Sequence, residues 1–293
     1  MVRDAKQETG QRLARFLLWG CDMRKLLFIA MAWVNVGGSL AHAVELRSEL
    51  AVGKEFVYVT NGAETELLDG QLGIGAGLTM VSDYATERYG AHGLIEYRGA
   101  YLSAGVTATF GPRQQRRSWA SVDPHAELHV EGQRWSVRAD TGVLLRRIDV
   151  AAPVGSISVD QLQLHVGAQA TIEGRWRVGA LALYSFYDPS PAGARLRDLD
   201  LGLAVTLAGR PERWAAGAHA ARRLSRPLWL ELGITGVVYA NGRGSALVPR
   251  AGLLLGPWRG ISIGASVDLV ADLDPLVEER VRAIGGLELE YER

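Results

Sequence analysis

Cysteine is almost absent from this chain. Its 293 residues contain one, Cys21, which precedes Met23. A single cysteine cannot form a disulfide within the chain, so no covalent cross-link stabilises the fold. The lack of cysteine after Met23 suits a protein exported through an oxidising compartment. Leu18-Trp19-Gly20-Cys21 has a weak similarity to a lipoprotein box, but the apolar run before it is too short for a lipid-anchor signal.

An excess of charge of one sign is missing as well. The chain has 32 Lys and Arg against 32 Asp and Glu, a net charge of zero at pH 7. A nucleic-acid binder needs a basic surface that neutralises phosphates. We therefore expect no nucleic-acid partner.

Long apolar runs are missing after residue 44. The longest uncharged stretch there is Gly99–Pro112, which carries Gly, Ser and Thr throughout. A membrane-spanning helix needs about 20 apolar residues. Because lipid satisfies no backbone hydrogen bonds, this part of the chain could cross a membrane only as a closed β-barrel.

A targeting segment precedes that part. Met23-Arg24-Lys25 leads into the uncharged run Leu26–Val44, which contains Ala41-His42-Ala43 near its end. A basic start, an apolar core and a small-x-small site define a secretory signal peptide. A transmembrane helix is the alternative, but Gly37 and other polar or small residues leave only about ten strongly apolar positions. We expect cleavage before Val44.

The expected organisation follows from this boundary. Residues 1–22 are a non-native upstream extension from a mis-chosen start codon, and residues 23–43 are the signal peptide. Residues 44–70 form an N-terminal segment or first strand, and residues 71–293 form a β-barrel.

The remaining sequence is rich in glycine and in alternating apolar and polar residues. In Gly260–Asp272, residues Ile261, Ile263, Ala265, Val267, Leu269 and Ala271 share one face and polar or small residues the other. Period two identifies a β-strand. Many of the 35 glycines fall inside such segments, which indicates close packing in a small, strongly curved barrel.

The sequence predicts an all-β fold: a single transmembrane antiparallel up-and-down β-barrel of about 12 strands, with 14 as the alternative. Val44–Thr60 is partly strand-like, and Pro211–Leu224 resembles a short helix because of its alanines. Twelve strands omit both segments and keep all tight turns on one side of the membrane. The expected strands are Gln71–Asp83, His92–Arg98, Tyr101–Phe110, Ala126–Glu131, Arg134–Asp149, Ser156–Glu173, Arg175–Tyr187, Leu196–Ala208, Leu228–Ala240, Ala246–Leu255, Gly260–Asp272 and Arg280–Glu292.

Several tryptophans follow a turn of Gly, Arg or Pro, with an arginine often beside them. Tryptophan favours the membrane interface, so these residues are candidates for an aromatic girdle. The alternative is that tryptophan simply starts strands well. The girdle candidates are Trp135, Trp176, Trp229 and Trp258, with Trp214 as a further member of the pattern.

Two short segments resemble the opening hairpin of several uncharacterised outer-membrane barrels: Leu78–Tyr84 and, after a loop, Gly93–Tyr97. The chain as a whole resembles Gram-negative outer-membrane β-barrel proteins. It departs from them at its end, because Tyr291 is followed by Glu292-Arg293 where such barrels end on an aromatic residue. The resemblance implies an outer-membrane location. The partners it implies are membrane lipids, lipopolysaccharide, periplasmic chaperones and the barrel-assembly machinery.

Charged residues alternate along many strands. A charge facing lipid costs a few kcal/mol, so these side chains are expected to line the lumen. The lumen-lining candidates are Glu96, Arg98, Glu127, His129, Glu131, Arg138, Asp140, Asp198, Asp200, Glu231, Asp268, Arg282, Glu288 and Glu290, with Asp160 and the Gln161–Gln169 face beside them. They either pair and fill a narrow barrel or form a wetted passage that, being mostly acidic, prefers cations.

No catalytic, cofactor or metal site is predicted. His125 and His129 are four apart, which in a strand is about 13 Å, too far to share one ion. Ser118, Ser121 and His125 could belong to an outer-membrane hydrolase, but no Gly-x-Ser-x-Gly pattern accompanies them.

The leading functional hypothesis is therefore a passive, porin-like channel for small polar solutes. One alternative is a non-conducting structural or surface-interaction barrel, whose Arg-rich Gly111–Ser118 loop contacts lipopolysaccharide. A membrane hydrolase and a soluble secreted β-protein are the remaining alternatives. The sequence specifies neither the solute nor the oligomeric state.

Overall fold

The computed structural model describes residues 44–52, 56–83, 87–114, 117–151, 156–188, 212–240, 244–258, 260–274 and 280–291. All of them belong to the compact unit Ala43–Arg293. Within these ranges no helix has the length and apolar character needed to cross a membrane.

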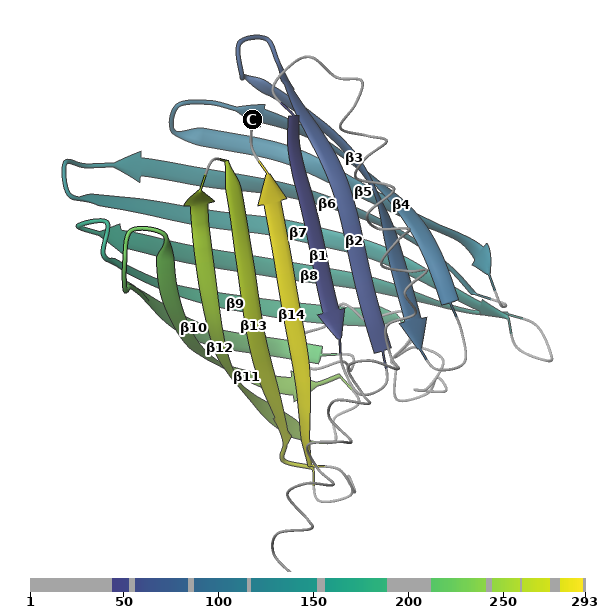
Figure 1. Ribbon diagram of the computed structural model, residues 1–293. Coiled ribbons are helices and arrows are strands. Elements are labelled where there is room, and N and C mark those ends of the chain that lie inside the picture. Colours follow the sequence, from purple (N-terminus) through teal and green to yellow (C-terminus); the bar gives the residue numbers. More distant parts are fainter. Residues whose placement is uncertain are drawn as a thin grey trace, which may run out of the picture. The chain divides into compact units, whose positions relative to one another are not determined.

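The described residues form one closed wall of fourteen antiparallel strands (Figure 1). Each strand pairs with the next along the chain, and β1 pairs with β14 to close the barrel. The strands are β1 Val44–Val52, β2 Phe56–Leu67, β3 Leu72–Asp83, β4 Glu87–Arg98, β5 Leu102–Gln114, β6 Arg117–Glu131, β7 Trp135–Ala151, β8 Ser156–Ile172, β9 Trp176–Asp188, β10 Glu212–Arg223, β11 Leu228–Tyr239, β12 Ser245–Trp258, β13 Ile261–Asp272 and β14 Val281–Tyr291.

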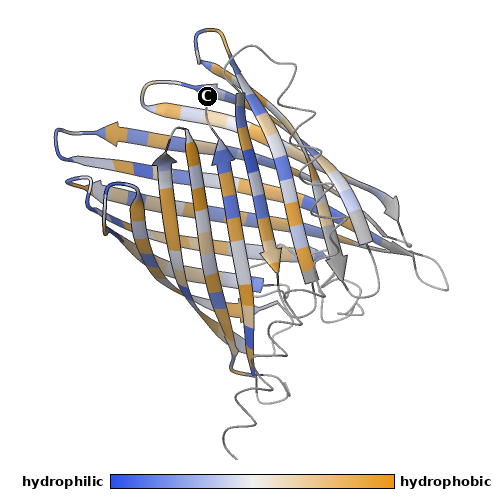
Figure 2. Cartoon of the chain, in the orientation of Figure 1, coloured by the Kyte–Doolittle hydropathy of each residue, from blue (hydrophilic) through white to orange (hydrophobic). Residues whose placement is uncertain are grey.

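The two faces of the wall differ in chemistry. Along β13, Ile263 and Val267 are exposed, whereas Ser266 and Asp268 are half-buried on the opposite face. Antiparallel partners point to the same face, so the register extends this assignment around the barrel. Figure 2 shows the resulting alternation along the strands. The exposed outer face includes Leu78, Ile95, Phe110, Val122, Leu128, Leu145, Leu164, Val166, Phe186, Leu232, Ile234, Leu253, Val267 and Leu287.

Tight turns lie at one end of the barrel. Leu68–Gln71 joins β2 to β3, and Glu173–Arg175 joins β8 to β9. The second turn is closed by a hydrogen bond in which Arg175 N donates to Ile172 O, 3.0 Å away. Leu68 (φ 53°), Asp69 (φ 56°) and Glu173 (φ 52°) adopt the left-handed region that tight reversal requires. The first residue of β1 and the last of β14 lie at this same end, as an even strand number demands.

The preferred count of twelve strands is wrong, and the alternative of fourteen is correct. Val44–Thr60 supplies β1 and the start of β2. Pro211–Leu224 does not form a helix: its residues Glu212–Arg223 are β10, which pairs with β9 on one side and β11 on the other. The expected strand Leu196–Ala208 lies outside the described residues.

The alanines of β10 explain why the sequence suggested a helix. They occupy both faces of the strand, so no apolar–polar alternation marks it. Ala215 and Ala221 are buried on the inner face, whereas Ala218 lies on the outer face. β10 pairs directly with β9, so including it keeps the tight turns at the same end of the barrel. The expectation that only a twelve-stranded barrel would do so is therefore wrong.

The strands around the expected basic loop are longer than predicted. β5 continues to Gln114 and β6 begins at Arg117, so most of Gly111–Ser118 belongs to the wall. β4 likewise begins at Glu87, before the expected His92.

Candidate functional site

Apart from Asp160, the lumen-lining candidates that the structure describes all lie on the inner face. Glu127 is opposite Asp140, and His129 is opposite Arg138 on β6 and β7. Arg250 of β12 is opposite Asp268 of β13. The inner-face candidates are Glu96, Arg98, Glu127, His129, Glu131, Arg138, Asp140, Glu231, Asp268, Arg282, Glu288 and Glu290. Asp198 and Asp200 lie outside the described residues.

Arg98 of β4 holds three carboxylates together. Its guanidinium contacts Glu64, lies 2.7 Å from Glu66 through Nη1, and lies 2.9 Å from Glu96 through Nε. These acids come from β2 and from β4 itself, so one arginine crosses β3 to reach β2. Inner-face Gly73 and Gly75 of β3 leave that path open, and an added Cβ at Gly73 would meet Glu64 and Arg98.

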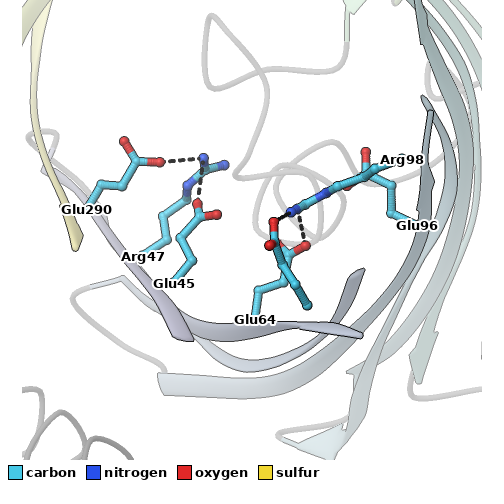
Figure 3. A network of polar contacts seen from close by, with 7 residues as sticks. Glu45, Arg47, Glu64, Glu96, Arg98 and Glu290 are labelled. Carbon is cyan, nitrogen blue, oxygen red and sulfur yellow. Dashed lines mark hydrogen bonds and ion pairs between the residues drawn. The ribbon is translucent and has the colours of Figure 1, made fainter. Parts of the chain in front are cut away.

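A second cluster spans the closure of the barrel (Figure 3). Arg47 Nη2 lies 2.8 Å from Glu290 of β14 and 3.3 Å from Glu45 of β1. The residues of β1 and β2 were not among the lumen candidates predicted from the sequence. The alternation of Glu45, Arg47 and Glu49 against Leu46 and Leu50 was the signal for them.

Weaker pairs continue around the inner face. Arg250 lies 3.6 Å from Glu231 and 3.9 Å from Asp268. Acids outnumber arginines on the described inner face, so the lumen carries net negative charge. The acids are Glu45, Glu49, Glu64, Glu66, Glu96, Asp123, Glu127, Glu131, Asp140, Glu231, Asp268, Asp272, Glu288 and Glu290; the arginines are Arg47, Arg98, Arg138, Arg146, Arg177, Arg223, Arg250 and Arg282.

Asp160 is a correction to the expected lumen set. It lies on the outer face of β8, opposite Arg147 of β7, and their Oδ1 and Nε atoms are 3.7 Å apart. It shares its face with exposed Leu162 and Leu164, whereas Gln161 lies on the inner face. A side chain two residues from a lipid-facing leucine must point the same way.

The expected aromatic girdle is only partly on the outer face. Trp135 (49% exposed) and Trp176 (45% exposed) point outward beside the tight turns, and Trp214 (44% exposed) also points outward. Trp229 is 5% exposed and lies on the inner face, so the girdle assignment is wrong for this residue. The side chain of Trp258 lies outside the described set.

Arginines cover Trp229 on the inner face. The Arg177 guanidinium carbon lies 4.1 Å from the ring centroid and that of Arg223 lies 5.7 Å from it. Buried Ala221, opposite Arg177, is small enough to let Arg177 extend across β10 to the ring. Arg177 and Arg223 were not among the residues predicted from the sequence to line the lumen.

Part of the inner face, at the end away from the tight turns, is apolar and tightly packed. Ile148, Val159 and Tyr187 form one buried cluster there. A second cluster contains Ala215, Val237, Tyr239, Ala246, Val248 and Val270. Gln161 donates from Nε2 to the Tyr187 hydroxyl at 3.2 Å, and that hydroxyl donates to Glu212 O at 3.2 Å. Both clusters therefore lie on the inner face of the β7–β13 side.

Histidines lie at mid-wall on alternate strands. The inner face carries His92 on β4, His125 on β6, His165 on β8 and His219 on β10. The residues opposite these histidines on the neighbouring strands are often glycines. Added Cβ atoms at Gly77, Gly142 and Gly179 would overlap the imidazoles of His92, His165 and His219. Within the described part of the chain, no group of three or more His, Cys, Asp or Glu could hold a metal ion.

The hydrolase candidates are not brought into a catalytic arrangement. Ser121 and His125 both lie on the inner face of β6, and Ser118 lies on the outer face. The His125 imidazole Nδ1 is 3.1 Å from the backbone oxygen of Asp123. No hydrogen bond joins His125 to Ser118 or Ser121 among the described residues.

No protein-family model matches the chain. No curated protein matches it either. Its similarity is to solved structures. A bacterial polysaccharide outer membrane secretin aligns with TM-score 0.50 and 9% identity, covering 87% of this chain and 100% of the other. The outer membrane channel DcaP of Acinetobacter baumannii aligns with TM-score 0.45 and 10% identity, covering 86% and 96%.

A KdgM porin in complex with disordered oligogalacturonate aligns with TM-score 0.44 and 6% identity, covering 84% of this chain and 98% of the porin. At these identities the similarity concerns the fold alone. The closed wall of fourteen strands, together with the alignment to the secretin, gives this chain the fold of outer-membrane β-barrel proteins.

Proposed function

We propose that this protein is a passive channel of the Gram-negative outer membrane that admits small polar solutes. The observation that carries the proposal is the contrast between the two faces of the closed wall. The outer face exposes large apolar side chains on each strand from β3 to β14, and the inner face carries ion pairs, amides and hydroxyls. A closed wall with this contrast suits a bilayer outside and water inside.

Location in the outer membrane follows from the same contrast and from the expected signal peptide. Lipid and lipopolysaccharide would surround the apolar band, with Trp135 and Trp176 at the interface beside the tight turns. Periplasmic chaperones and the barrel-assembly machinery would deliver and insert the chain. Fractionation tests this location: recovery of the protein in the soluble periplasmic fraction would contradict it.

The solute class is a polar molecule, with cations favoured over anions. The carboxylates of β1, β2, β4 and β14 gather on one side of the lumen, where Arg47 and Arg98 neutralise only part of them. A confined acidic lining lowers the energy of a cation and raises that of an anion.

A second candidate function is a closed structural barrel. The packed apolar clusters around Val159 (0% exposed) and Val270 (0% exposed) favour it, because such burial on an inner face is typical of a filled interior. In that case the ion pairs would stabilise the wall rather than line a passage.

Conductance separates the two functions. The protein, refolded in detergent and inserted into planar bilayers, is expected to give discrete, ohmic current steps with a permeability ratio that favours potassium over chloride. Absence of any current in repeated reconstitutions of folded barrel would support the closed form. Folding is checked beforehand by the mobility difference between heated and unheated samples on a gel.

A further inference from the structure

We propose that Arg177 and Arg223 form a binding site for one oxyanion group, a carboxylate or a phosphate, on the inner face near the tight turns. The site would take a small polar molecule that bears this group. This inference deepens the proposed channel function, because it needs a water-filled lumen at that level. The site is positively charged, whereas the lining around it is mostly acidic.

The position of Arg177 is fixed by its neighbours in the wall. It lies on β9 opposite Thr171 of β8 and Ala221 of β10, and it stacks on Trp229 of β11 at 4.1 Å. Stacking on an aromatic face uses the flat side of the guanidinium and leaves its N–H edges for hydrogen bonds. The methyl group of Ala221 does not obstruct those edges.

Arg223 is held by the backbone. Its Nε and Nη2 donate to Arg226 O at 3.1 and 2.7 Å, and its Nη1 donates to Gly174 O at 3.4 Å. These bonds tie the side chain to two tight turns. Because the rotamer is already fixed, little conformational entropy remains to be lost when an anion binds.

The charge of the cluster is not balanced by acids. Arg177 is repelled by Arg138 and Arg223, and Glu231 is the acid that attracts it. Glu231 lies 3.6 Å from Arg250, so this acid is shared with another partner. Among the described residues, neither Arg177 nor Arg223 forms an ion pair.

An oxyanion group suits this arrangement. Guanidinium edges bind carboxylates and phosphates through paired, charge-assisted hydrogen bonds. Arg177 is half-buried, which strengthens such bonds relative to those of a fully exposed side chain. A polyanion would be repelled by the carboxylates elsewhere in the lumen, so the site fits a molecule with a single such group.

The test is equilibrium dialysis of the full, detergent-folded barrel against radiolabelled phosphate or lactate at constant ionic strength. Arg177→Gln and Arg223→Gln should each weaken binding at least tenfold, and Arg177→Lys should weaken it less than Arg177→Gln. The matched control is Arg222→Gln. Arg222 is the neighbour of Arg223 but lies on the outer face, 5.3 Å from the Trp176 ring, and should not affect binding.

A failure of this binding site can be distinguished from a failure of the proposed channel function. Dialysis detects binding whether or not ions cross the barrel, and conductance detects only the passage of ions. Tighter binding of lactate assigns the site to carboxylates and tighter binding of phosphate assigns it to phosphate esters; either result supports the proposal. Lack of saturable binding by the folded protein would overturn it. So would an equal loss in the Arg222→Gln variant, since that would indicate a general charge effect. If Arg177→Gln does not fold, Arg223→Gln and Arg177→Lys decide.

Discussion

Glu49 of β1 lies directly opposite Glu288 of β14, and both side chains are on the inner face of the barrel. Arg47 and Arg250 lie near enough to Glu49 to attract it, but neither forms an ion pair with it among the described residues. Two facing carboxylates at this position concentrate negative charge in the lumen. They offer the most direct test of its selectivity.

The double substitution Glu49→Gln/Glu288→Gln should lower the preference for cations by about twofold or more, because it removes two charges from a confined space. Reversal potentials across a gradient of potassium chloride measure the change. Asp160→Asn is the matched control, since Asp160 lies on the outer face and should leave the permeability ratio unchanged. An anion-selective pore in the unmodified protein would contradict the expected acidic lining.

The two faces of β13 should respond differently to arginine. Ile263→Arg and Val267→Arg place a charge on the outer face and should cost about 2–4 kcal/mol each near the bilayer centre. Ser266→Arg should be tolerated better, because Ser266 lies on the inner face between Gly252 and Gly286. Urea titrations of the barrel refolded in lipid vesicles report the stabilities. Equal losses in all three variants would mean that the assignment of faces is wrong.

Gly77→Ala should destabilise the barrel by about 1–3 kcal/mol through overpacking. The added methyl group would overlap both the Asn61 carbonyl oxygen and the imidazole of His92. Gly93→Ala is the control on the next strand: its methyl group would point outward and meet only Gly75 O, 3.8 Å away. Urea midpoints are compared between the two variants. A Gly77→Ala barrel as stable as the Gly93→Ala barrel would show that the inner face is more open here than the structure has it.

The tryptophans should differ in their contact with lipid. Brominated lipids quench indoles that reach the acyl chains, so Trp176→Phe should reduce the quenched fraction of the total fluorescence. Trp229→Phe should leave the quenched emission unchanged, because Trp229 is on the inner face. Loss of quenched emission on replacing Trp229 would place that ring outside the wall.

The mature protein should begin at Val44. The apolar segment before Ala41-His42-Ala43 and its basic start fit a signal peptide that is removed during export. N-terminal sequencing of the protein from the membrane fraction gives the answer. A sequence that still starts before Met23 would rule out a cleaved signal at this place.

Strands with strict alternation were predictable, because one side chain in two faces lipid and must be apolar. β13 is the clearest example, and its inner and outer residues agree with the prediction. β10 was not predictable in the same way. Its alanines are compatible with either face and with a helix, and only pairing with β9 and β11 settles its conformation.

The wrong assignments of single side chains have a different origin. They would have been avoided if the two-residue period of a strand had been applied to every residue in it. Trp229 and Glu231 are two residues apart on β11, so they share a face, and the sequence assigned them to opposite faces. The cluster around Arg177 could not be found from sequence. It joins β9, β10 and β11, and only the register of those strands brings its members together.

Arg47 and Glu290 are 243 positions apart in the chain yet lie 2.8 Å apart where β1 meets β14. The first and last described strands thus form a seam, and no other pair of neighbouring strands in the described wall is so distant in sequence. Removing either terminal strand would leave two unsatisfied edges facing hydrocarbon, rather than a shorter wall. Synthesis of β14 is therefore a precondition for β1 to pair along both of its edges.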